Sequence, residues 1–115
     1  MRIDVKTKNV HDTNTIHDFV NQKLSNSIKR FASEVASIAV RVEDETRTSG
    51  RFDGICSMDA TLTPGGTLHV SAHGDSWHDC ILQAVRKLEN ALRHDRNRKR
   101  NANNIRHEMA RSKDR

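Results

Sequence analysis

The stretch that most constrains the fold of this chain is residues 76–100, where an amphipathic helical pattern runs directly into a series of cations. Apolar side chains recur at intervals of three and four residues, so they share one face of a helix. They are Trp77, Ile81, Ala84, Val85, Leu88 and Leu92. Ser76, followed three residues later by Asp79, is the signature of a helix N-terminus. One helix is therefore expected to anchor a core and to carry positive charge beyond it.

Four other segments alternate apolar and polar residues, which is typical of half-buried β-strands. They span residues 2–7, 35–43, 52–62 and 68–73. Pro64, Gly65 and Gly66 predict a tight hairpin turn between the last two strands.

A second amphipathic helix is predicted between the first two strands, beginning at Thr13 or Thr15, with a capping box from Thr15 to Asp18. Its apolar positions again follow the helical interval. They are Ile16, Phe19, Val20, Leu24, Ile28 and Phe31.

The predicted order of elements is β-α-β-β-β-α. A helix between the first two strands permits a right-handed parallel crossover, and the remaining strand pairs are antiparallel. Because one side of every strand is polar, both helices must cover the same apolar face. We therefore predict an α+β fold, a two-layer sandwich in which a four-stranded mixed sheet carries two helices on one face. Residues 1–100 are expected to form this domain, and residues 101–115 a flexible, basic C-terminal tail.

The net charge of +5 is concentrated at the C-terminus. Residues 93–115 carry nine Lys or Arg against three Asp or Glu, whereas residues 1–92 carry eleven against twelve. A basic block of this kind favours a polyanionic partner, and nucleic acid is the commonest one in the cytoplasm. A tail that serves solubility alone is the alternative.

Catalysis and cofactor binding have little support in the sequence. Cys56 and Cys80 form no CxxC pair and fall on apolar faces, as expected of buried thiols in a reducing compartment. His69 and His73 project from one strand face, close in the chain to His78 and Cys80, and zinc could use such ligands. Cys80 is expected to point to the core and His78 to lie one turn into the helix, so the four side chains would not converge and we expect no metal. No glycine-rich phosphate loop follows a strand, and we expect no enzyme and no cofactor.

The chain begins without the apolar region of a signal peptide and has no apolar run of membrane-spanning length. A cytoplasmic location without membrane contact is the expectation.

The order of elements, residues 62–72 (LTPGGTLHVSA) and the helix from Ile81 to Leu92 with Lys87-Leu88 at its middle together resemble the ribosome hibernation promoting factor family. That family includes the ribosome-associated translation inhibitors and is also described as sigma-54 modulation proteins. The resemblance covers residues 1–100 and is to the short form, so pairing of ribosomes through a second domain is not expected. Asn26 replaces a Lys of many members, and His78 replaces a tyrosine.

The resemblance implies a partner and a site. Family members bind the small ribosomal subunit in the channel used by mRNA and by the anticodon ends of tRNA, which keeps idle ribosomes from translating under stress. Basic side chains on the helices contact ribosomal RNA phosphates. The cations that match the family, together with those at the end of the first predicted helix, form the predicted RNA-binding set. They are Lys23, Lys29, Arg30, Arg86, Lys87, Arg93, Arg96, Arg98, Lys99 and Arg100.

Two other functions remain open from the residues alone. One is a general RNA-binding or RNA-chaperone module that uses the basic tail. The other is a homodimeric protein-interaction module that uses the edge strands or the open sheet face. The protein itself is expected to be a monomer or a weak homodimer.

Overall fold

The computed structural model describes residues 1–44 and 53–113, with side chains described up to residue 100. The elements along the chain are β1 (Arg2–Lys8), α1 (Thr13–Ser27), the 3-10 turn η1 (Lys29–Phe31), β2 (Val35–Asp44), β3 (Gly54–Leu62), β4 (Thr67–Gly74) and α2 (Trp77–Lys113). The predicted order β-α-β-β-β-α is confirmed.

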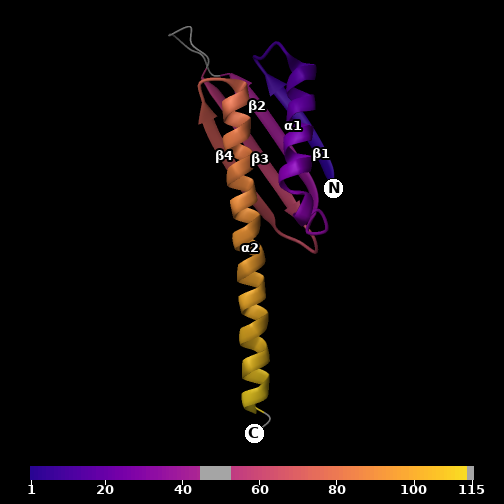
Figure 1. Ribbon diagram of the computed structural model, residues 1–115, viewed down its shortest axis with the longest axis vertical. Helices are drawn as coiled ribbons and strands as arrows, with labels where there is room; N and C mark the ends of the chain where they lie inside the picture. The colour runs from indigo at the N-terminus through magenta and orange to yellow at the C-terminus, as the bar shows by residue number, and fades with distance from the viewer. Residues whose placement is uncertain (45–52, 114–115) are drawn as a thin grey trace.

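The four strands form one mixed sheet in the order β1-β2-β3-β4. β1 runs parallel to β2, and the other two strand pairs are antiparallel. The register places Val5, Val40, Met58 and Val70 side by side across the whole sheet. α1 and α2 lie side by side over this same face (Figure 1). The α+β sandwich predicted from the alternation is therefore confirmed.

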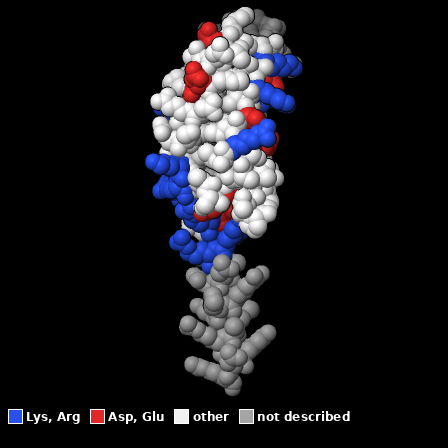
Figure 2. All heavy atoms as spheres, turned by 90° about the vertical axis from the view of Figure 1, so that its right-hand side faces the viewer, with Lys and Arg blue, Asp and Glu red and all other residues white. Residues whose placement is uncertain are grey.

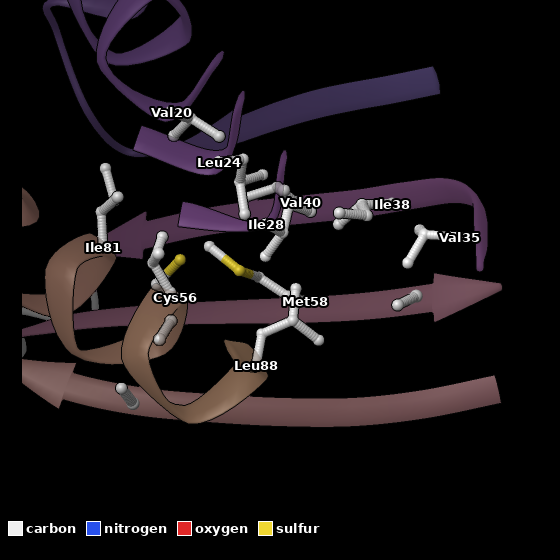
Figure 3. Packing of buried hydrophobic residues seen from close by; sticks show 14 of the residues in the cluster. Val20, Leu24, Ile28, Val35, Ile38, Val40, Cys56, Met58, Ile81 and Leu88 are labelled. Atoms are coloured by element: carbon white, nitrogen blue, oxygen red, sulfur yellow. The ribbon is translucent and has the colours of Figure 1, made fainter. Parts of the chain in front are cut away.

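The core lies between the sheet and the two helices. Buried aliphatic side chains from α1 and α2 fill the space between the helices and the sheet, together with Cys56 and Met58 of β3 (Figure 3). Val20 and Leu24 come from α1, and Ile81 and Leu88 from α2. Both cysteines are buried and unpaired, as predicted. Arg2, Lys6 and Arg41 are exposed on the opposite, polar face of the sheet, alternating with the inward residues as strand geometry requires.

The first helix begins at Thr13, one of the two predicted starts, but its C-terminal end and its N-terminal cap differ from the prediction. It ends at Ser27, and the chain tightens into η1, where the Phe31 N–H bonds to the Ile28 carbonyl at 2.9 Å. Ile28 and Phe31 are nevertheless buried, because the tighter turn still points both toward the sheet. The capping box from Thr15 is wrong: Asp12 occupies the N-cap without a side-chain hydrogen bond, so Thr15 lies inside the first turn.

The second helix begins as predicted, since the Asp79 N–H donates to Ser76 Oγ at 3.0 Å. It then continues as a single helix to Lys113, well beyond the sheet, and gives the molecule its length of 69 Å (Figure 1). The backbone of residues 101–113 is thus helical. The flexibility expected of residues 101–115 stays a prediction.

Candidate nucleic-acid interface

Three arginines of α2 form a stripe on the side of the helix away from the core. Arg86, Arg93 and Arg100 are spaced seven residues apart, so they lie within about 40° of one another around the helix axis. All three are exposed, whereas Leu88 and Leu92 face the sheet. We call these three residues the arginine stripe. Lys and Arg side chains gather at the end of the folded body from which α2 emerges (Figure 2).

The turn η1, which follows α1, brings further cations against this stripe. Arg30 of η1 contacts Glu89 of α2 at 2.8 Å, and Arg93 contacts the same carboxylate oxygen at 3.1 Å. Glu89 thus lies between two arginines and neutralises one of them. An open groove of about 600 Å³ runs here, lined by Asn26, Ser27, Lys29, Arg30 and Glu89. Lys29 is exposed at its rim.

Arg96 has a structural role that its sequence position does not reveal. Its Nε donates to Glu34 at 2.8 Å, and one terminal nitrogen donates to the Arg30 carbonyl at 2.8 Å. The guanidinium lies 4.2 Å from the centre of the Phe31 ring, within cation–π distance. Arg96 therefore holds η1 and the following loop against α2.

Asp95 pairs with two more of the predicted cations. Its carboxylate is buried at the end of the core and contacts Arg98 and Lys99, each at 3.0 Å. Burial opposes ionisation of Asp95, but the hydrogen bonds from Lys99 and Arg98 outweigh it and lower its pKa. One of the two positive charges of Arg98 and Lys99 is thus balanced by Asp95.

The remaining cations differ in their surroundings. Lys87 donates to the backbone carbonyl of Ser71 on the edge strand β4 at 2.8 Å. Lys23 lies 5.5 Å from the centre of the Phe19 ring. In the part of the chain whose side chains are described, Lys29, Arg86 and Arg100 make no ion pair or side-chain hydrogen bond. The predicted set therefore separates into available cations and cations engaged by the fold.

The histidines do not converge on one point. His69 lies on the open face of the sheet, 2.5 Å from Asp59 on the neighbouring strand, whereas His78 packs against Phe19 in the helix layer. No group of three or more His, Cys, Asp or Glu side chains arranged to hold a metal occurs within the described residues. The sequence pattern did not predict the cluster of Phe19, Trp77 and His78, because the apolar spacing indicates only that the first two face inward.

Nor does any helix within the described ranges have the length and apolar character needed to cross a membrane.

The fold and the charge distribution define a small α+β domain whose helix layer presents cations to the solvent. A family model described as sigma 54 modulation protein / S30EA ribosomal protein matches residues 3–100. The chain belongs to this family, as the sequence resemblance indicated.

Two solved structures share the fold. A ribosomal subunit interface protein from Coxiella burnetii has a TM-score of 0.70 and 20% identity, with 84% of this chain and 98% of that chain covered. The N-terminal domain of Protein Y from Thermus thermophilus has a TM-score of 0.63 and 20% identity, covering 81% and 93% of the two chains. A comparison with curated protein sequences returned no match.

Proposed function

We propose that this protein is a translation inhibitor that binds the small ribosomal subunit and occupies the channel of mRNA and tRNA. Membership of the S30EA ribosomal protein family supports a ribosomal partner. The observation that carries the proposal is the arginine stripe, extended by Lys29 across the groove, because it gives the helix layer an exposed row of cations.

The inhibition proposed here is steric, with electrostatics supplying the affinity. Each Lys or Arg that neutralises a phosphate releases condensed counterions, so affinity falls steeply as salt rises. Folded RNA is recognised largely by its shape and backbone, which suits a rigid helix surface. The protein needs no catalytic step and no cofactor to block the channel, and it acts in the cytoplasm with the ribosomes.

The test is co-sedimentation with purified ribosomal subunits across a salt series, with bulk RNA as competitor. Saturable binding to the small subunit that resists the competitor is expected. Displacement of mRNA and tRNA from the same subunits would place the protein in the channel. Binding that bulk RNA removes easily would overturn the proposal.

The projecting half of α2 favours a second candidate, a general RNA-binding module that uses the basic tail. Truncation after Arg100, and then after Leu92, separates the two. A protein that binds through the helix layer keeps most of its affinity in the first truncation. A tail-only binder loses its affinity in the first truncation.

A homodimeric interaction module, the third candidate, would show a concentration-dependent mass without salt-sensitive RNA binding.

A further inference from the structure

Three aromatic rings meet where α1 lies beside the start of α2. The centre of the Phe19 ring is 4.5 Å from that of His78, with the ring planes tilted by 37°. Trp77 meets Phe19 edge-on at 5.5 Å and His78 at 5.8 Å. Phe19 and Trp77 are half-buried against the core, but His78 is exposed. The cluster thus has an inner part within the protein and an outer ring in solvent.

Core packing explains the inner part of this ring cluster and not the outer part. Aromatic pairs stabilise a fold through buried area and edge-to-face contact, and Phe19 with Trp77 has both. His78 leaves its imidazole exposed, so the burial that rewards Phe19 and Trp77 is largely missing for it. A planar ring presented to solvent on a supported aromatic base is the arrangement on which unpaired nucleobases stack.

The charges along the helix pair fit a nucleic-acid strand leaving this cluster. The Lys23 ammonium lies 5.5 Å from the centre of the Phe19 ring, one helical turn along α1. Further along, Arg30 and Arg93 flank Glu89, leaving a net positive charge at that end. We call the strip from His78 through Lys23 to Arg93 the helix seam.

The helix seam is long enough for more than one nucleotide. His78 and Arg93 are fifteen residues apart on α2, which corresponds to about 22 Å at ~1.5 Å per residue. Even one strand of a B-form duplex, which advances ~3.4 Å per nucleotide along the helix axis, would place several nucleotides along a strip of this length. Aromatic stacking at one end and cations along the strip are the two parts of a site for single-stranded nucleic acid.

We propose that His78, supported by Phe19 and Trp77, stacks on an unpaired base of RNA, and that the following phosphates lie beside Lys23 and the arginines of the helix seam. This inference rests on the proposed function in taking RNA as the partner. It adds a base contact to a surface otherwise described by charge alone. Stacking tolerates any base, so the site selects unpaired over paired RNA rather than a sequence.

Trp77 is the one tryptophan of the chain, which also has no tyrosine, so its fluorescence reports on the ring cluster directly. The first experiment titrates the full chain with a short oligoadenylate and with an abasic ribose-phosphate oligomer of equal length. Quenching of Trp77 by the oligoadenylate, with little change by the abasic oligomer, is expected. Equal responses to the two ligands would overturn the stacking site.

Two substitutions of His78 test whether binding depends on its aromatic ring or on its polarity. His78→Gln keeps a polar side chain without an aromatic ring and is expected to weaken oligoadenylate binding about tenfold. His78→Phe restores a ring and is expected to restore affinity. His94→Gln, at another exposed histidine of α2, is the matched control and is expected to bind like the unmodified protein.

The outcomes distinguish this inference from the proposed function. If His78→Gln binds oligoadenylate and the small subunit as tightly as the control variant, the stacking site is wrong while ribosome binding stands. If the unmodified protein fails the subunit assay yet oligoadenylate quenches Trp77 and His78→Gln abolishes the effect, stacking stands and the ribosomal function fails.

Discussion

Arg96 of α2 donates a hydrogen bond to Glu34 at 2.8 Å, although the two residues lie 62 positions apart in the chain. The same guanidinium also donates to the Arg30 carbonyl and covers the Phe31 ring. An arginine in the middle of a basic series is therefore committed to joining α2 to the segment after α1. Arg96 thus has a structural role, which distinguishes it from the exposed cations for which RNA binding is proposed.

Arg96→Ala is expected to destabilise the protein by about 1–2 kcal/mol, because it removes hydrogen bonds to a partly exposed carboxylate and to a backbone carbonyl. Arg100→Ala, which removes an exposed cation of the same helix, is the control and should leave stability within about 0.5 kcal/mol. Urea unfolding measures both. Equal stabilities for the two variants would contradict the structural role of Arg96.

Reversing charge at Arg86 tests the arginine stripe. Arg86→Glu is expected to weaken binding to the small subunit and to reduce the slope of log affinity against log salt by about 1, with an unchanged thermal melt. Lys87→Glu is expected to lower stability as well, because it removes the hydrogen bond to Ser71 on the edge strand. An Arg86→Glu protein with unchanged affinity and salt dependence would remove Arg86 from the interface.

Asp95→Asn is expected to change stability and RNA binding in opposite directions. The carboxylate has a lowered pKa in the folded protein, so it stabilises the fold above its ordinary pKa of 3.8, and this stabilisation is lost as pH falls through the folded value. The variant should be less stable at neutral pH, with a difference that shrinks in acid. It also releases Arg98 and Lys99, so RNA should bind more tightly. Unfolding across a pH series and filter binding check the two effects.

The buried thiols should make the protein sensitive to alkali. Burial raises the pKa of Cys56 to about 12 and that of Cys80 to about 11, from an ordinary value of 9.0. Because the folded values lie above the unfolded ones, the thiols favour the folded state fully below pH 9, and this contribution is lost as pH rises through the folded values.

The prediction for the thiols is checked by measuring the free energy of unfolding at a series of pH values from neutral upward. The double variant Cys56→Ala/Cys80→Ala is the control that keeps every lysine, and its profile should fall less steeply above pH 9. In the native unmodified protein, a thiol reagent should react slowly at neutral pH, and denaturant should accelerate the reaction. Superimposable pH profiles for the two proteins would contradict this assignment.

The fold could be predicted because the helical period and the strand alternation of apolar residues indicate directly which side chains are buried. Leu88 and Leu92 of α2, and most valines and isoleucines of the strands, face the core that their spacing indicated. Ile55 of β3 is different, since it lies beside Glu43 and His73 on the other face of the sheet. The end of α1 was less predictable, since Ile28 and Phe31 keep a helical spacing that a 3-10 turn also satisfies.

The exposed cations on the helices could be predicted from the sequence, but their individual surroundings could not. The pairs of Arg30 with Glu89 and of Arg96 with Glu34 join residues 59 and 62 positions apart, which local spacing does not reveal. The ring cluster was missed for the same reason, because Phe19 and His78 come together only when α1 lies beside α2. RNA binding by the individual cations remains a prediction.

Because α2 is continuous from Trp77 to Lys113, the direction in which its later residues face around the helix axis is fixed relative to the domain. One residue inserted after Arg100 would rotate the following residues by about 100° around the helix axis, and an insertion of seven would nearly restore their direction while displacing them by about 10 Å. A partner that contacts both the sandwich and the end of α2 would thus be sensitive to the distance between them and to the direction in which the end of α2 faces.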